Sequence, residues 1–230
     1  MATITWLGHA CWLIQTGKHS ILLDPFLDSC PTASCKAADI RADYVLVSHG
    51  HFDHIADAAA VANQNNATLV ANYEIATWFA EKQGVKETIG MNLGGSVPTA
   101  FGSVTMTIAW HSSVLPDGTY GGAPAGFLLQ LRDEGKRIYF ACDTALFSDM
   151  RLIRGDLELD LAVLPIGDLY TMGINDSLAA TRLLQPKLVA PSHYNTWPAI
   201  AQNVELWAQR VSQETSAQAR VLVPGESFSL

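Results

Sequence analysis

The sequence predicts a protein of the mixed α/β (α+β) class, in which two packed β-sheets carry helices on their outer faces. Hydrophobic residues make up 49% of the 230 residues and charged residues only 16%, which is typical of a chain with a large core and excludes intrinsic disorder. Strand-like segments come in two runs, each followed by helical segments, without strict strand–helix alternation. No linker divides the chain, so we expect one domain over residues 1–230.

The first run of strands begins at the N-terminus. Short strand-like segments separated by glycine-containing turns indicate an antiparallel meander over residues 4–7, 11–15 and 20–23. Residues 43–47 (DYVLV) form the apolar run of a buried strand. The Ala-rich segment 55–65 and the amphipathic segment 73–83 are expected to be helices, with a strand over 67–71 between them.

The second run of strands fills the rest of the chain. We expect strands over residues 103–109, 126–132, 136–141, 160–164, 187–191 and 220–223. The sequence Asp-Glu-Gly at 133–135 is a hairpin signal. A helix is expected over 176–185, with Asn175 as its N-cap and Pro186 as its stop, and a last helix near Pro198.

Charge and hydropathy exclude several classes of partner. The net charge of −8 argues against a nucleic-acid partner, because phosphate binding needs a basic surface. No apolar run reaches the length of about 18 residues that spans a membrane. The N-terminus lacks the basic start of a signal peptide, so we expect a cytoplasmic protein. Cys30 and Cys35 are candidates for a disulfide or for half of a zinc site. A reducing compartment favours the alternative, in which both are free thiols in a loop.

One motif carries most of the chemical information. The sequence SHGHFDH at residues 48–54 follows the buried strand 43–47 and precedes a helix. Side chains at i and i+2 of an extended segment point the same way, so His49 and His51 can bind one ion. Asp53 and His54 follow where the chain turns toward the helix, and they can bind a second ion.

This motif resembles the signature of the metallo-β-lactamase superfamily, and the resemblance extends from Trp6 to Gly225. It implies a four-layer αββα sandwich of two mixed sheets. Further segments resemble a compact branch of metal-dependent hydrolases. These segments are WLGHACWLI, LLDPF, GTYGGAPAGF, PIGDLYTMG and PSHYNTWP. The branch is related to the ascorbate-6-phosphate lactonases and, more distantly, to phospholipase-D-like members.

The resemblance also implies a set of metal ligands. A first metal would be bound by His49, His51 and His111, a second by Asp53, His54 and His193, and Asp143 would bridge the two. Imidazole and carboxylate suit zinc, the expected ion, while manganese, iron and nickel are alternatives.

The implied activity is that of a binuclear metal-dependent hydrolase. Two cations about 3.5–4 Å apart can share a water molecule and lower its pKa, so that metal-bound water or hydroxide cleaves a small ester, lactone or amide. Asp53 is expected to orient this nucleophile and accept its proton. Redox di-iron members of the superfamily usually carry Glu where this chain has His51, which favours hydrolysis.

Two other functions stay open: a phosphodiesterase or nuclease of the same superfamily, and a non-catalytic metal-binding protein. The loops expected around the metals contain no Lys or Arg, which a phosphate-rich substrate would need. We therefore expect a small, neutral or weakly charged substrate, and no nucleic-acid or membrane partner. Whether identical chains assemble into a homo-oligomer stays open.

Four further residues are candidates for supporting roles. Asp24 resembles the early Asp with which the superfamily braces its His-rich loop, and the alternative is a turn cap. His9 is either a substrate contact or structural. Tyr170 and Tyr194 either line the pocket or pack against it.

Overall fold

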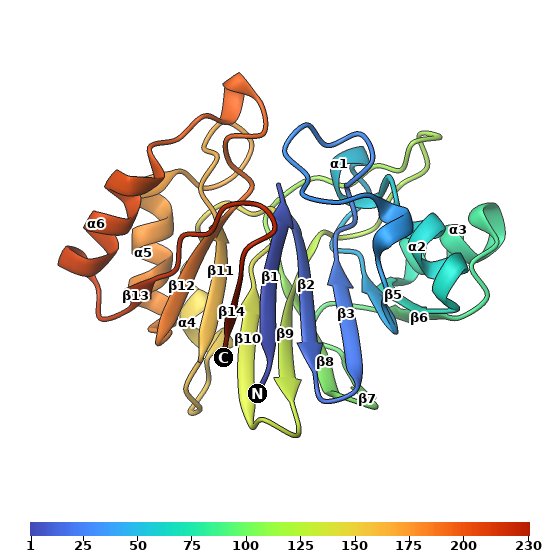
Figure 1. The fold of residues 1–230 in the computed structure, drawn as a ribbon, viewed down its shortest axis with the longest axis horizontal. Helices are drawn as coiled ribbons and strands as arrows, with labels where there is room; N and C mark the ends of the chain where they lie inside the picture. Colours follow the sequence, from blue (N-terminus) through green and yellow to red (C-terminus); the bar gives the residue numbers. More distant parts are fainter.

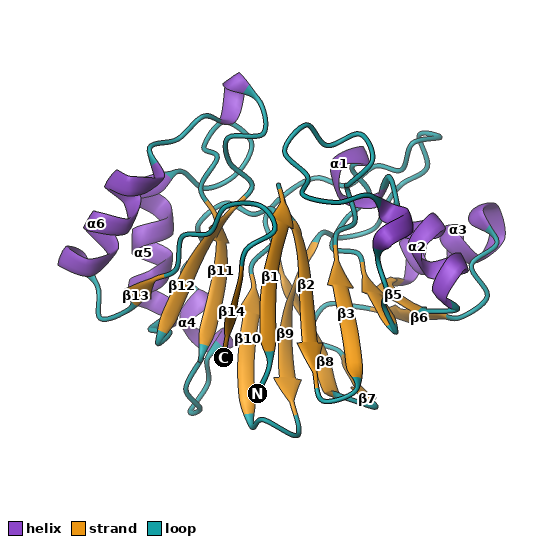
Figure 2. Ribbon diagram, viewed as in Figure 1, coloured by secondary structure: helices purple, strands orange, loops and turns teal.

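The structure, a computed structural model, describes all residues 1–230 and contains two seven-stranded sheets that face each other (Figures 1 and 2). In the first sheet the strand order is β14–β1–β2–β3–β4–β5–β6. Its antiparallel half contains β14, β1, β2 and β3, and its parallel half contains β3 to β6. The strands are β1 (Thr3–Gly8), β2 (Cys11–Thr16), β3 (His19–Leu23), β4 (Tyr44–Leu46), β5 (Thr68–Asn72), β6 (Thr88–Met91) and β14 (Ser227–Ser229).

The second sheet is also mixed, with the order β13–β12–β11–β10–β9–β8–β7. Strands β10 to β13 are parallel, and β7 to β10 are antiparallel. The strands are β7 (Ser96–Thr99), β8 (Gly102–Ile108), β9 (Ala125–Leu131), β10 (Lys136–Phe140), β11 (Leu161–Pro165), β12 (Leu188–Ser192) and β13 (Gln218–Ala219).

Helices cover the outer faces of both sheets, α2 and α3 on one side and α5 and α6 on the other (Figure 1). The helices are α1 (Phe52–Ile55), α2 (Ala58–Asn65), α3 (Tyr73–Gln83), α4 (Met150–Ile153), α5 (Ile174–Leu184) and α6 (Val204–Glu214), with 3₁₀ turns at Ala37–Asp39 and Pro198–Ile200. This arrangement confirms the predicted four-layer αββα sandwich. No helix has the length and apolarity needed to cross a membrane.

Two hydrophobic clusters hold these layers together. The larger one, of 39 buried residues, takes side chains from both sheets and from α5 and α6. Trp12 of β2 reaches across to Phe140 of β10, with ring centroids 6.3 Å apart. The smaller cluster, of 22 residues, joins the first sheet to α2 and α3. Burial of these apolar surfaces is the main force that fixes the position of the strand ends.

The structure confirms the predicted meander and hairpin, and it corrects several element boundaries. The helix expected over 55–65 is split into α1 and α2. Between them, the Asp57 carboxylate accepts hydrogen bonds from the backbone of Leu27 at 2.6 Å and Asp28 at 3.1 Å, which pulls this turn out of helical geometry. Sequence reasoning missed β6, β7, α4, β13 and β14.

The C-terminal part differs more. The N-cap of α5 is Gly173 instead of Asn175, whose side chain accepts a hydrogen bond from Arg210. Pro198 begins a 3₁₀ turn, and α6 starts only at Val204, where Asn203 caps it by accepting from Leu206 N at 2.9 Å. The strand expected over 220–223 is absent, since the chain crosses there from β13 in the second sheet to β14 in the first.

The sandwich brings the carboxyl ends of six strands to one edge. Strands β1, β3 and β4 run in the same direction in the first sheet, as do β8, β10 and β12 in the second. Ligands of α/β proteins commonly bind at such an edge.

We predict that the core between the sheets dominates stability. Replacing buried Leu129 of β9 with Ala should lower the free energy of unfolding by about 2–5 kcal/mol, because it removes apolar contacts and leaves a cavity. The matched variant Leu169→Ala, at a side chain that is 65% exposed, should change it by less than about 0.5 kcal/mol. Urea denaturation measures both, and equal effects would contradict the assignment of the core.

Candidate metal centre

Six loops meet at the edge where these strands end. They follow β1, β3, β4, β8, β10 and β12, and they carry His9, Asp24, the segment 48–54, His111, Asp143 and His193, respectively. His9, Asp24 and His193 have positive φ angles of 49°, 44° and 53°. Such left-handed conformations are unfavourable for residues with a side chain, and they tend to occur at functional sites.

The first donor group consists of His49, His51 and His111, and one ring nitrogen from each lies within 4.8 Å of the other two. His49 Nε2 and His51 Nδ1 are 3.0 Å apart. Gly50 between them is required by a close approach, since a Cβ there would lie 2.9 Å from the Val114 carbonyl oxygen. The structure therefore brings together the three residues that the sequence predicted for a first metal.

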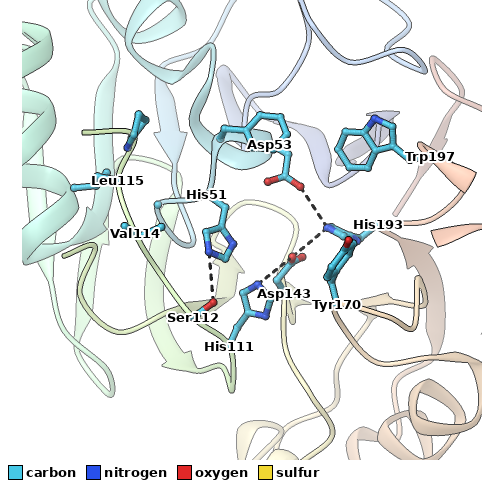
Figure 3. A pocket seen from close by; sticks show the side chains of 13 residues that line it. His51, Asp53, His111, Ser112, Val114, Leu115, Asp143, Tyr170, His193 and Trp197 are labelled. Atoms are coloured by element: carbon cyan, nitrogen blue, oxygen red, sulfur yellow. Dashed lines mark hydrogen bonds and ion pairs between the residues drawn. The ribbon is translucent and has the colours of Figure 1, made fainter. Parts of the chain in front are cut away.

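The second donor group contains Asp53, His54 and His193, as predicted, and His9 in addition. Asp53 Oδ2 lies 3.7 Å from His193 Nε2 and 3.9 Å from His54 Nε2. Figure 3 shows Asp53 and His193 turned toward each other across the pocket.

Asp143 lies between the two groups. Its Oδ2 is 3.1 Å from His193 Nε2, 3.3 Å from His54 Nε2 and 3.7 Å from His111 Nε2. Its other oxygen, Oδ1, is buried and has no hydrogen-bond partner. This position between the groups is the one expected for a carboxylate that bridges two cations.

The residues fit divalent cations. Five imidazoles and two carboxylates converge, the donor set that zinc and similar ions prefer. His54 Nε2 and Asp143 Oδ1 are buried without hydrogen-bond partners, although buried polar atoms normally have them. His54 Nε2 faces Asp143 Oδ2 at 3.3 Å, and a divalent cation bound here would give partners to such donor atoms.

The pKa values divide the histidines into two sets. Burial lowers the pKa of His49, His51 and His111, so these imidazoles are neutral and offer free lone pairs. Burial would also lower the pKa of His54 and His193, but the Asp143 carboxylate outweighs it. The pKa of His193 rises to about 9, and that of His54 rises well above its ordinary value.

Asp24 braces the His-rich loop, as the resemblance implied. Its side chain is fully buried and accepts hydrogen bonds from Ser48 N at 2.8 Å, Ser48 Oγ at 2.6 Å and His54 Nδ1 at 2.8 Å. The bond to Nδ1 leaves Nε2 of His54 directed at Asp143. Asp24 therefore fixes the ring of His54 from behind, and Ser48 is a participant that the sequence did not single out.

His9 lies behind Asp53 and does not line the pocket, which favours the structural interpretation over the substrate contact. Its Nε2 is 3.1 Å from Asp53 Oδ2, and its Nδ1 is 2.7 Å from Thr196 Oγ1. Burial lowers the pKa of His9 to about 4, so the ring is neutral. A neutral ring that donates from Nε2 to Asp53 accepts at Nδ1 from the Thr196 hydroxyl.

The two tyrosines differ from each other. Tyr170 lines the pocket beside His193 (Figure 3). Tyr194 does not line it: the side chain is buried and stacks on Trp6, with ring centroids 5.2 Å apart. The left-handed conformations of His193 and Asn195 on either side of Tyr194 accompany this packing.

An open pocket of about 650 Å³ leads to the donor groups, and we call it the metal pocket. Apolar side chains make up much of its wall, and no Lys or Arg lines it, as the loop composition indicated (Figure 3). The lining residues are Gly50, His51, Phe52, Asp53, His111, Ser112, Val114, Leu115, Pro116, Asp143, Tyr170, His193 and Trp197. Ser112 went unnoticed in the sequence, and its position next to His111 is the signal that could have found it.

Comparison with known proteins agrees with this fold and site. The family model "Beta-lactamase superfamily domain" matches residues 3–193. A UPF0173 metal-dependent hydrolase of Thermus thermophilus is 48% identical over 230 residues, covering 100% of both chains. One of Archaeoglobus fulgidus is 42% identical, covering 98% of this chain and 97% of the relative.

A solved structure supports the same relation. Igni18, described as a novel metallo hydrolase from Ignicoccus hospitalis, is 31% identical with a TM-score of 0.87, covering 100% of this chain and 99% of its own. The chain therefore belongs to the β-lactamase superfamily and, within it, to the UPF0173 metal-dependent hydrolases.

We predict that Asp24 tunes metal binding through His54. Asp24→Asn should weaken the affinity of the centre for zinc by about 10–100-fold, the usual effect of removing a group that orients a ligand. Competition with a chromophoric chelator measures this affinity. Asp160→Asn is the matched control, because Asp160 is another buried carboxylate but pairs with Lys136 and Lys187 away from the metal pocket. Equal losses in both variants would contradict the role of Asp24.

Metal uptake should also release protons. In the metal-free protein at about pH 7.5 the raised pKa values keep His54 and His193 protonated, and metal binding must displace those protons. Calorimetry in buffers of different ionisation enthalpy should show release of about two protons per chain. The number should fall above about pH 9, where His193 is already deprotonated. No release near pH 7.5 would show that these rings are neutral before metal binds.

Proposed function

We propose that this protein hydrolyses small uncharged esters, lactones or amides at a centre of two divalent cations, with zinc as the expected ion. The observation that carries the proposal is the metal pocket itself: seven donor side chains converge at the base of an open, largely apolar pocket that no Lys or Arg lines. His49, His51 and His111 would hold one cation, Asp53, His54 and His193 the other, and Asp143 would contact both. Bound cations of this kind polarise a carbonyl group and lower the pKa of water.

Asp53 is the residue best placed to orient the attacking water. Its side chain reaches the pocket and is 14% exposed. Burial would raise its pKa, but His193 and His9 hold it far below the usual range, so the carboxylate is ionised. A carboxylate with so low a pKa orients water by accepting a hydrogen bond better than it stores a proton, and we assign Asp53 that role.

The neutral groups of the pocket suit a neutral substrate. The Tyr170 hydroxyl and the Ser112 hydroxyl are uncharged hydrogen-bond donors at its wall. The rings of Phe52 and Trp197 offer apolar surface, 6.2 Å apart between centroids. A phosphodiester would leave its charge without a cationic side chain here, which disfavours the phosphodiesterase or nuclease alternative.

The openness of the site favours catalysis over metal storage or sensing. His51, Asp53 and His111 are only partly buried and face the pocket, whereas structural metal sites are closed by protein ligands. We further propose that the partner is a small molecule and not nucleic acid or a membrane.

The direct test is an assay of metal-quantified protein against esters, lactones, thioesters, amides and phosphodiesters in parallel. We expect turnover of carboxylic esters or lactones. Turnover confined to phosphodiesters would overturn the proposal.

Asp53→Asn should lower kcat by about 10²–10⁴-fold, because the amide orients water poorly and weakens the second donor group. Thermal unfolding should confirm that the variant folds, and the metal content should be measured alongside. Asp149→Asn, at an exposed carboxylate of a neighbouring loop, should leave kcat unchanged. An unchanged kcat in Asp53→Asn would remove Asp53 from the mechanism.

A further inference from the structure

A second depression, of about 520 Å³, lies beside the metal pocket, and we call it the side groove. Its walls come from α1 and α2 on one side, from α3 on the other and from the loop after His111. The lining residues are Phe52, Ile55, Ala56, Ala59, Trp78, Phe79, Lys82, Gln83, Pro116 and Asp117. Most of this surface is apolar.

The side groove continues the metal pocket. Phe52 and Pro116 line both, so a molecule that passes over these two residues contacts both cavities without leaving the surface. Phe52 is 60% exposed, although its ring is large and apolar. An exposed apolar ring between two cavities is typical of a ligand-binding surface.

The floor of the groove is fixed. Trp78 Nε1 donates to Asp117 Oδ2 at 2.8 Å, and Thr119 N donates to Asp117 Oδ1 at 3.0 Å, which ties the loop to α3. Both oxygens of Asp117 are therefore already engaged. The charges of Lys82 and Asp117 are opposite, so the groove has no net charge and favours an uncharged apolar occupant.

We propose that the side groove binds the acyl chain of the substrate while the substrate carbonyl lies in the metal pocket. The inference rests on the proposed function, and it narrows the substrate class to esters or amides of carboxylic acids with an apolar acyl chain. In the reaction, the bond from the acyl carbon to the leaving oxygen or nitrogen breaks, and the water oxygen bonds to the acyl carbon. One proton of the water passes to the leaving alcohol or amine, and the other belongs to the carboxylic acid product. The chain in the groove takes no part in this step and contributes binding energy.

A chain-length series tests the inference. For p-nitrophenyl esters from acetyl to decanoyl, assayed below their aggregation limits with the zinc-loaded protein, kcat/KM should rise about fourfold for each methylene that is buried. The rise should end where the groove is full. A kcat/KM that is independent of chain length, with the esters still hydrolysed, would overturn the inference and leave the proposed function standing.

A variant that fills the groove gives the matched comparison. Ala59 of α2 is partly buried and packs on the smaller core cluster, and Ala208 of α6 is partly buried and packs on the larger one. The ratio of kcat/KM for octanoyl over butanoyl esters should be about 250 in the wild type and should fall below about 10 in Ala59→Phe, because the ring occupies the space of the chain. Ala208→Phe should keep the wild-type ratio. An unchanged ratio in a folded Ala59→Phe would contradict the groove.

A binding experiment makes the test independent of turnover. Alkyl hydroxamates, whose head group chelates zinc, should bind the zinc-loaded protein with a Kd that falls about fourfold per methylene. A falling Kd without hydrolysis of any ester would support the groove while contradicting the proposed function. A constant Kd would overturn the groove even if Ala59→Phe fails to fold. A change in the oligomeric state of Ala59→Phe by analytical ultracentrifugation would assign the groove to a second copy of the chain and overturn the inference.

Discussion

Burial of charge at the edge of the sandwich is the constraint on which the site depends. Asp24, Asp143 and most of Asp53 are removed from water, together with four buried histidine rings, those of His9, His49, His54 and His193. Carboxylates in such a place must be paired with positive charge and hydrogen bonds, because an isolated buried charge is very unfavourable. The raised pKa values of His54 and His193 show how the chain meets this need by protonation alone. Bound divalent cations would meet the same need and would also give partners to two buried atoms that lack hydrogen bonds, His54 Nε2 and Asp143 Oδ1.

The fold places these groups by holding unfavourable backbone conformations at the strand ends. His9, Asp24, Cys142 and His193 all have positive φ angles, and each such residue costs about 1–3 kcal/mol. The two hydrophobic clusters behind the site supply the packing that keeps the strand ends in place. Two hydrogen bonds then fix the rotamers of His54 and Asp53, because Asp24 accepts one from His54 and His9 donates one to Asp53.

The sequence predicted the parts of the structure that depend on local patterns. Strand-like runs broken by turns predicted the meander, and the Asp-Glu-Gly turn predicted the hairpin. The motif at 48–54 indicated metal binding, and the resemblance to the superfamily implied the three later donors. Long-range contacts decided the rest. Asp57 divides a helix because it binds the backbone of residues 27 and 28. Asn175 is not a cap because α5 already begins at Ile174, and its side chain accepts a hydrogen bond from Arg210. The short edge strand Ser96–Thr99 contains Pro98 and has no strand signal of its own. Tyr194 adjoins a donor in the sequence, yet the turn at His193 directs it onto Trp6.

The assignment of the metal ligands is tested most directly by anomalous X-ray diffraction at the zinc absorption edge, measured on crystals of the zinc-loaded protein. We predict two peaks at the end of the sandwich, one among His49, His51 and His111 and the other among Asp53, His54 and His193, with Asp143 contacting both. A protein that binds no ordered zinc there, or whose only peak lies outside this cluster, would contradict the assignment of these seven side chains.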